Sequence, residues 1–296
     1  MNAVPSMEQL GLDATQASRS IGDILIESGR LSAADATRIF EQQQTDQSQF
    51  GDAGIALKIL TKDDIDFALS QQFEYSYLDE KDVSLSPELV AAYKPFSKVG
   101  ENLRAVRSQL MLRWFNEERR RKAIAVVSAA PAEGRSFVAA NLAIVFAQQG
   151  QRTLLIDGNM RAGPHKGQQA LFKLDKSPGL SGLLAGRAGL ETMLEIPGLP
   201  GLSVLPCGAI PPNPQELLGR TPFEALLQSA SSGFEAIIID TPAGRDFADA
   251  EIIAARVGAV VLITRKNVSL LPAAVALARR LQDGGVALVG SILNDD

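Results

Sequence analysis

The nine residues SAAPAEGRS, 128–136, combine a turn of small residues with one basic side chain and one hydroxyl. They follow the pattern of a phosphate-binding loop, G-x-x-x-x-G-K-[ST], at Gly134 and Ser136. They depart from it at Ala129, which stands at the first glycine position, and at Arg135, which stands at the lysine position. A strand-to-helix turn without a ligand is the alternative, and the motif alone does not decide between the two.

The chemistry of such a loop comes from its backbone and its last residues. Backbone N–H groups at a helix N-terminus bind phosphate oxygens, and the serine hydroxyl binds Mg²⁺. Arg135 keeps the positive charge of the usual lysine, but a planar guanidinium fork does not simply replace a point charge. The residues expected to contact a nucleotide are Ala132, Glu133, Gly134, Arg135, Ser136 and Phe137.

Two carboxylates end apolar runs elsewhere in the chain. Asp157 closes TLLID, and Asp240 closes AIIID. A carboxylate at the carboxyl end of a strand beside a phosphate-binding loop is placed to hold a nucleotide-bound Mg²⁺. The alternative is that each aspartate caps the turn that follows it. We expect Mg²⁺ to be held by Ser136, Asp157 and Asp240, and the catalytic residues to be Asp157, Arg135 and Asp240.

These residues need a sheet to position them, and the sequence from Lys122 onward predicts one. Apolar, largely β-branched runs alternate with helical stretches, which indicates a doubly wound α/β fold with a parallel sheet of about six or more strands. In such sheets ligands bind beyond the carboxyl ends of the strands. The predicted strands are residues 123–128, 152–157, 202–206, 236–240, 259–264 and 286–292.

The first quarter of the chain contains an internal repeat instead. Residues 21–43 match residues 50–72 at an offset of 29. In each copy a hydroxyl residue, Ser32 or Thr61, precedes an acid by three positions, which is typical of a helix N-cap. We therefore predict an all-α tandem-repeat domain.

The predicted domain order follows from these patterns. ENLRAVRSQLMLRWFNEE, 101–118, has the apolar spacing of an amphipathic helix. Charge runs and prolines before it indicate a connector with one short helix. The predicted segments are a loose tail at 1–18, the helical repeat domain at 19–73, a linker at 74–100 and the P-loop domain at 101–294.

Together, SAAPAEGRS, TLLIDGNMR and IIIDTP resemble the Walker A, A′ and B motifs of bacterial tyrosine kinases, which are deviant P-loop ATPases. PPNPQELL, 211–218, and ENLRAVR, 101–107, resemble two further motifs of that family. The resemblance covers about residues 86–294. Within the family, the chain is most similar to the EpsG-type chain-length determinant kinases of exopolysaccharide clusters.

The resemblance implies ATP and Mg²⁺ as ligands and a role in exopolysaccharide chain length or export. It also implies a membrane polysaccharide co-polymerase as partner. The family's E-x-x-R-x-x-R motif implies a ring-like homo-oligomer with contacts through Glu101, Arg104 and Arg107. At helical spacing the same residues also suit a solvated, salt-bridged face, so that alternative stays open.

Departures from the family pattern leave two functions open. Asn159 stands where the A′ motif has a second aspartate, and the printed chain ends in GSILNDD without the family's tyrosine cluster. The tyrosines are Tyr75, Tyr77 and Tyr93. A tyrosine-kinase-like enzyme is one hypothesis, with no autophosphorylation expected at the tail. A nucleotide-dependent switch or scaffold without phosphate transfer is the other.

The repeat resembles the helical domain at the front of type II secretion and pilus ATPases, some of which bind cyclic di-GMP. Ser20 and Gln49 stand where that motif has its guanine-contacting arginines. We therefore favour a docking module and keep cyclic di-GMP as the alternative ligand.

Bulk composition restricts the other partners. The net charge of −5 argues against a nucleic-acid-binding face. One cysteine in 296 residues fits a reducing compartment. The sequence contains no run of about 18 apolar residues, the length that would predict a membrane span. We therefore expect a cytoplasmic protein that is held at the inner membrane, if at all, by its partner.

Overall fold

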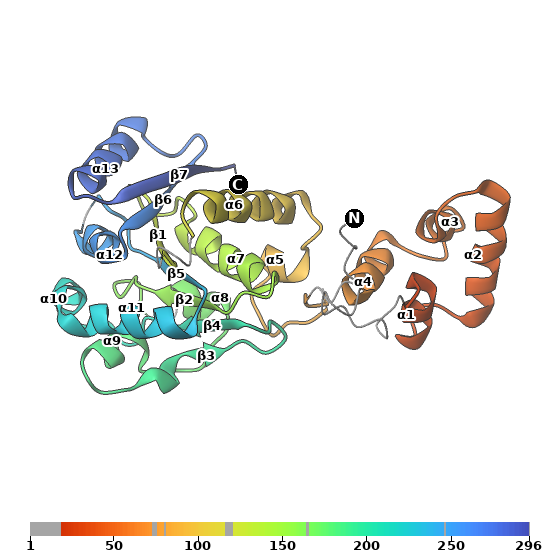
Figure 1. Cartoon of the computed structure of the whole chain (residues 1–296), viewed down its shortest axis with the longest axis horizontal. Helices are drawn as coiled ribbons and strands as arrows, with labels where there is room; N and C mark the ends of the chain where they lie inside the picture. Colours follow the sequence, from red (N-terminus) through yellow and green to blue (C-terminus); the bar gives the residue numbers. More distant parts are fainter. Residues whose placement is uncertain are drawn as a thin grey trace, which may run out of the picture. The chain divides into compact units, whose positions relative to one another are not determined.

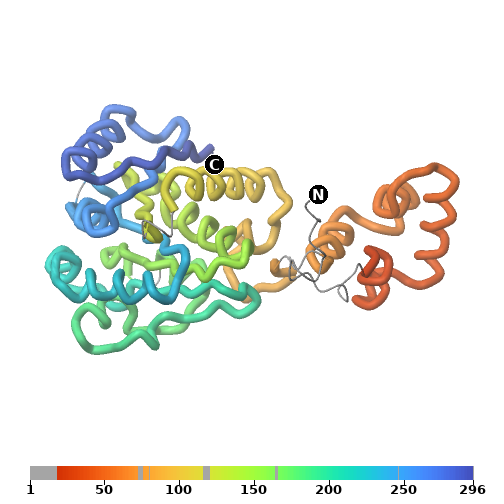
Figure 2. Tube along the Cα trace, viewed as in Figure 1, coloured from red at the N-terminus to blue at the C-terminus, as the bar shows by residue number. Residues whose placement is uncertain are grey.

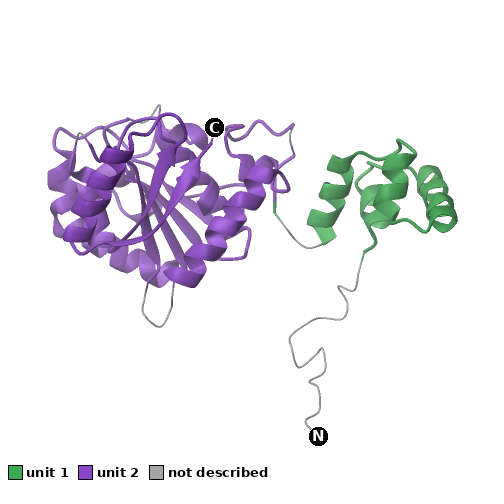
Figure 3. Ribbon diagram, turned by 90° about the horizontal axis from the view of Figure 1, so that it is seen from above, with its two compact units in different colours: residues 1–76 green, residues 77–296 purple. Residues whose placement is uncertain are grey.

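The computed structural model describes residues 19–72, 76–79, 81–115, 121–163, 166–245 and 247–295. The chain divides into two compact units, residues 1–76 and residues 77–296, which are coloured separately in Figure 3. Each unit has a hydrophobic core of its own. None of the helices within the described ranges is long and apolar enough to cross a membrane.

Unit 1 is helical (Figure 2), and its two longer helices, α2 and α4, begin where the capping pattern predicts. The hydroxyl of Ser32 accepts a hydrogen bond from Asp35 N at 3.1 Å, and that of Thr61 accepts one from Asp64 N at 3.2 Å. The helices are α1 (Ile21–Glu27), α2 (Ala33–Asp46), α3 (Phe50–Ala56) and α4 (Lys62–Gln72). The buried core consists of Ile24, Leu25, Leu31, Ile39, Ala53, Leu60 and Ala68.

Unit 2 contains a seven-stranded sheet in the order β3-β4-β2-β5-β1-β6-β7. Its strands are β1 (Ala123–Val127), β2 (Thr153–Asp157), β3 (Leu194–Glu195), β4 (Leu202–Leu205), β5 (Ala236–Asp240), β6 (Ala259–Arg265) and β7 (Ala287–Asn294). All neighbours are parallel except β3, which is antiparallel to β4. The six predicted strands and the α/β class are confirmed. The sequence did not predict β3, which is only two residues long.

Helices cover both faces of the sheet (Figure 1). Successive strand residues point to opposite faces. Ile238 therefore packs in the core that contains α7 residues, and its neighbours Ile237 and Ile239 pack in the core that contains α12 and α13 residues. The first face carries α5 (Val90–Tyr93), α6 (Lys98–Arg113) and α7 (Arg135–Ala147). The second carries α10 (Pro214–Gly219), α11 (Thr221–Gly233), α12 (Asp249–Val257) and α13 (Leu271–Asp283). Two short helices, α8 (Gly167–Leu171) and α9 (Gly179–Leu184), and a 3-10 turn (Leu190–Thr192) lie in the connections between β2 and β3.

The segment assigned to a linker differs from its prediction. From residue 77 onward it belongs to unit 2, and Leu89 is fully buried in that unit's core. The Tyr93 hydroxyl donates to Leu85 O at 3.1 Å, and Ala91 N donates to the Asn141 side chain of α7 at 2.8 Å. The buried apolar residues of this segment follow no helix or strand period and lie among charged residues, so the sequence did not predict their burial.

Helix α6 is also shifted from its predicted range of 101–118. It begins at Lys98 because the Ser97 hydroxyl caps it by accepting from Gly100 N at 3.1 Å. It ends at Arg113, and the indole N–H of Trp114 donates to Ala123 O at 2.8 Å. Leu103 and Leu110 are buried, as the predicted apolar stripe requires.

Candidate functional site

The phosphate-binding-loop motif lies between β1 and α7, at the carboxyl edge of the sheet. Strand β1 pairs with β5 on one side and β6 on the other. Gly134 is the N-cap of α7 and has a φ of 96°, a left-handed conformation that favours glycine. The loop therefore directs the N-terminus of a 13-residue buried helix toward the edge where ligands of such sheets bind.

The two predicted carboxylates lie side by side at this edge. Asp157 and Asp240 are register partners on the adjacent strands β2 and β5. Both are buried, at 1% and 0% exposure. The Ser136 hydroxyl of α7 is a hydrogen-bond partner of Asp240. The structure thus brings together the three residues predicted to hold Mg²⁺.

Gln168 links these residues, and no sequence pattern had predicted it as a site residue. Its backbone N–H donates to Asp157 Oδ2 at 2.9 Å. Its side-chain amide donates to Asp240 Oδ2 at 2.9 Å and to Ser136 O at 3.2 Å. The side chain is fully buried. One glutamine at the start of α8 therefore contacts both carboxylates and the loop.

The burial of two neighbouring carboxylates changes their protonation. Burial, with the charge of Asp240 second, raises the pKa of Asp157 to about 8. Backbone hydrogen bonds from Gln168 and Asn159 oppose this rise. Burial also raises the pKa of Asp240, against hydrogen bonds from Ser136 and Gln168 and the charge of Arg135. Burial therefore favours the protonated forms of both carboxyl groups.

The residues present fit a divalent cation. Asp240 Oδ1 is buried and has no hydrogen-bond partner, which leaves a carboxylate oxygen available to a ligand. Carboxylate and hydroxyl oxygens are the ligands that Mg²⁺ prefers. Within the described ranges no group of three or more His, Cys, Asp or Glu side chains gathers to bind a metal. The oxygens that could contact a cation here are those of Asp240 and Ser136.

The guanidinium group of Arg135 is bonded within the protein. It is 9% exposed, and its guanidinium group donates to Thr241 O at 2.9 Å and to Ala130 O at 2.7 Å. It also donates to the Ser128 hydroxyl. The charge that the motif assigns to phosphate is thus bonded to oxygens of the protein itself.

Glu133 fixes the loop in a similar way. Its carboxylate is 1% exposed and accepts from Ala130 N at 2.7 Å and from the Ser269 hydroxyl. Arg265, the last residue of β6, donates to Ala132 O at 3.1 Å. Ala132 itself has a φ of 60°, which is uncommon for a residue with a side chain. The strained loop is therefore held by contacts from β6 and the turn after it.

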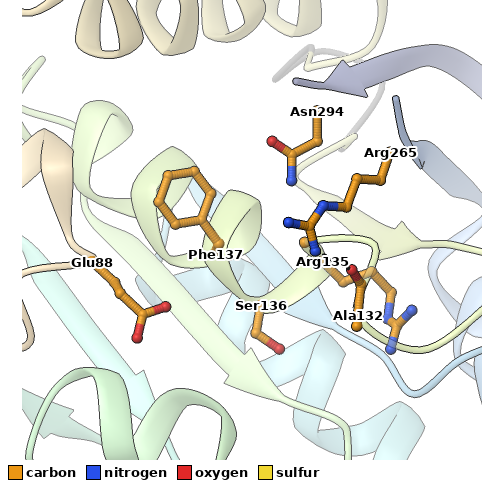
Figure 4. A pocket seen from close by; sticks show the side chains of 8 residues that line it. Glu88, Ala132, Arg135, Ser136, Phe137, Arg265 and Asn294 are labelled. Atoms are coloured by element: carbon orange, nitrogen blue, oxygen red, sulfur yellow. Dashed lines mark hydrogen bonds between the residues drawn. The ribbon is translucent and has the colours of Figure 1, made fainter. Parts of the chain in front are cut away.

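A cavity of about 350 Å³ opens beside the loop. Figure 4 shows its lining side chains, which come from the loop, from α7, from the ends of β6 and β7 and, at Glu88, from the segment before α5. The lining residues are Glu88, Ala132, Gly134, Arg135, Ser136, Phe137, Arg265 and Asn294. Five of the six residues predicted to contact nucleotide line it, and Glu133 does not. Glu88, Arg265 and Asn294 were not predicted.

Asn159 and the predicted residues of α6 do not line this cavity. Asn159 N donates to Asp157 Oδ1 at 3.1 Å, so this residue supports the first carboxylate through its backbone. On α6, Arg104 pairs with Glu101 at 2.6 Å, and Arg107 donates to Val145 O at 2.7 Å. The role of these α6 residues in subunit contacts remains a prediction.

Comparison with known proteins places this site in a family context. No family model matches the chain. The tyrosine-protein kinase ptk of Acinetobacter johnsonii is 37% identical over 196 residues, which are 66% of this chain and 26% of that protein. CapB of Staphylococcus aureus, named as a tyrosine-protein kinase, is 32% identical over 218 residues, 73% of this chain and 92% of CapB. The solved kinase domain of the Escherichia coli tyrosine kinase Etk has a TM-score of 0.66 at 30% identity, covering 75% of this chain and 85% of that domain.

Proposed function

Because the chain belongs to the family of bacterial tyrosine-protein kinases, which are ATP-dependent P-loop enzymes, we propose that it binds ATP with Mg²⁺ and phosphorylates tyrosine. The observation that supports this function best is the convergence of Ser136, Asp157 and Asp240 at one point beside the loop. The chain spans only 26% of the length of the Acinetobacter kinase, so we propose the tyrosine kinase activity for this chain and do not carry it over directly.

The site residues have separate roles in this proposal. Ser136 and Asp240 would bind Mg²⁺, and Asp157 would be the third residue beside the ion. When bound, Mg²⁺ neutralises charge that develops on the phosphoryl oxygens. The backbone from Ala132 to Phe137 binds phosphate oxygens at the N-terminus of α7.

Asp157 is also the base in this proposal. In phosphoryl transfer the tyrosyl oxygen attacks the γ-phosphorus, the bond from phosphorus to the ADP oxygen breaks, and the phenolic proton passes to a base. A catalytic base works best when its pKa lies near the working pH. Burial raises the pKa of Asp157 and a bound Mg²⁺ would oppose that rise, so the base role is proposed from the position of Asp157 beside the loop.

The tyrosines of the chain differ as acceptors. Tyr93 is 7% exposed and its hydroxyl is bonded to the backbone of Leu85, so it is unsuitable. Tyr77 is partly exposed and its ring lies edge-on to Phe96 at 6.2 Å. Tyr75 lies outside the described residues. We therefore propose Tyr77, Tyr75 or a tyrosine of another protein as the acceptor.

The proposed cellular role is based on the resemblance to the chain-length determinant kinases of exopolysaccharide clusters. We propose that the protein regulates exopolysaccharide chain length or export, together with a membrane co-polymerase and as a ring-like homo-oligomer. Unit 1 is then a docking module for the synthesis complex, with cyclic di-GMP as its alternative ligand. In this proposal the protein is cytoplasmic and the co-polymerase recruits it to the inner membrane.

A nucleotide-dependent switch is the second candidate function. Arg135 is bonded to protein oxygens, and Asn159 replaces a second aspartate of the A′ motif. Both features depart from the groups that the family's motifs place beside the phosphates and Mg²⁺. A switch of this kind would bind ATP and ADP, change its assembly state and leave tyrosine unmodified.

One experiment separates these functions. The full chain is incubated with ATP, Mg²⁺ and a copolymer of glutamate and tyrosine, and both ADP and phosphotyrosine are measured. The kinase hypothesis predicts both products, with phosphotyrosine reduced about 10²- to 10⁴-fold in Asp157→Asn. ADP without phosphotyrosine indicates an ATPase, and binding without turnover indicates the switch. A chain that binds no nucleotide would contradict both functions.

A further inference from the structure

We propose that Arg265, and not Arg135, is the side chain that contacts the phosphate groups of the bound nucleotide. This inference rests on the proposed nucleotide site. Arg135 stands at the motif's lysine position but bonds oxygens of the protein, whereas Arg265 reaches the same cavity from a neighbouring strand.

The contacts of Arg135 are those of a structural residue. Its guanidinium group bonds three oxygens, namely Thr241 O, Ala130 O and the Ser128 hydroxyl. These atoms belong to the ends of β1 and β5 and to the loop between β1 and α7. Turning the side chain toward a ligand would leave them without their donor, and an unpaired buried acceptor costs more than one hydrogen bond gains. Arg135 therefore stays in the loop when nucleotide binds.

Arg265 is placed differently. It ends β6, the direct neighbour of β1, so its side chain starts at the same edge as the loop. It is only partly buried, and one of its guanidinium nitrogens donates to Ala132 O at 3.1 Å. A guanidinium group has five N–H donors, and that contact uses one of them. The others are available to a group with two acceptor oxygens, such as a phosphate.

The cavity beside the loop supplies the ligand position. Arg265 lines it together with Gly134 and Ser136 at the start of α7. Arg135 lines it too, but its guanidinium group is engaged by the oxygens of Thr241, Ala130 and Ser128. Figure 4 shows the two guanidinium groups apart, that of Arg265 on the side of Asn294 and that of Arg135 farther from it. A phosphate chain in this cavity would meet the helix N-terminus and one adaptable guanidinium group. That combination replaces the lysine of the usual motif.

The test uses the full chain and measures the affinity of ADP and of adenosine by titration with Mg²⁺ present. Arg265→Ala is expected to weaken ADP binding about ten- to hundredfold, the range for a lost charge-assisted hydrogen bond. Adenosine has no phosphate and is expected to bind both proteins equally. The matched control is Lys266→Ala, which removes the same charge from the next residue, where Lys266 pairs with Asp295 at 2.7 Å outside the cavity.

Three results would overturn the assignment. Equal ADP affinity in wild type and Arg265→Ala would show that Arg265 does not contact phosphate. An equal loss for adenosine and ADP would place Arg265 on the base or ribose. A large gain of ADP affinity in Arg135→Lys, with Arg265 intact, would return the phosphate contact to the loop position. A wild-type chain that binds neither ligand would instead contradict the nucleotide site itself.

Discussion

The cores of the two units contain different kinds of side chain. The described part of unit 1 buries seven apolar residues and no carboxylate. Its buried Ser70 donates to Phe67 O at 2.7 Å, and the neutral hydroxyl oxygen of Ser48 has no hydrogen-bond partner. Unit 2 buries Asp157 and Asp240 beside each other and leaves one Asp240 oxygen without a partner. Burying a charged group costs free energy unless it is fully paired. Two adjacent buried carboxylates cost the fold free energy, and this difference supports the proposal that the cluster in unit 2 serves a ligand.

The largest expected effect breaks unit 1 alone. Leu25→Ala removes a fully buried side chain from a small core, so the free energy of unfolding of unit 1 should fall by about 2–5 kcal/mol. Nucleotide affinity should stay unchanged, since the described site residues all lie in unit 2. Calorimetric unfolding and ADP titration of the full chain measure the two quantities. A parallel loss of affinity with unit 2 still folded would show that unit 1 contributes to the site.

The next effect weakens the buried cluster of unit 2. Gln168→Ala removes the amide that donates to Asp240 and Ser136, so ATP turnover should fall about ten- to hundredfold. Gln169→Ala is the matched control, because that amide contacts only the backbone oxygens of Leu174 and Asp175. Steady-state ADP release measures both variants. Equal losses in the two would make Gln168 merely structural.

A smaller effect appears in the pH dependence of stability. The pKa of Asp157 rises from 3.8 in the unfolded chain to about 8 in the folded one. Between these values the folded state binds more protons, so the free energy of unfolding should fall as pH rises from 4 to 8. Asp157→Asn should flatten this dependence. Urea unfolding at pH 5, 6.5 and 8, without Mg²⁺ or nucleotide, measures it, and an unchanged slope in the variant would contradict the raised pKa.

The smallest effect returns to unit 1. Thr61→Ala removes the hydroxyl that accepts from Asp64 N at the start of α4, so stability should fall by about 1 kcal/mol. Thr37→Ala is the control, because that hydroxyl donates within α2 and caps no helix. Urea unfolding again reports the change. If the control is as costly as Thr61→Ala, the capping interaction is not the cause.

Most of the fold could be predicted because its signals are local. Unbroken apolar runs identify the strands, and the hydroxyl–acid spacing identifies helix starts such as Ser32. Asp157 and Asp240 could be found because each directly follows such a run. Their pairing across β2 and β5 then follows from the parallel sheet.

The rest depends on tertiary contacts. Gln168 comes eleven residues after Asp157, at the start of α8, and the sequence does not specify the path of the chain between them. The inward direction of Arg135 depends on oxygens such as Thr241 O, 106 residues away. Arg265 and Asn294 could have been predicted as site residues, because each is a polar residue at the carboxyl end of a strand. The loop motif predicts only residues between β1 and α7.

The central claim is that the buried carboxylates of unit 2 form a Mg²⁺-nucleotide site. The most direct measurement is a calorimetric titration of ATP into the full chain, with and without Mg²⁺, for wild type and Asp240→Ala. We predict binding that Mg²⁺ strengthens in wild type, and in Asp240→Ala only the weaker, Mg²⁺-independent part. Equal binding in both proteins, unaffected by Mg²⁺, would contradict the assignment of this cluster.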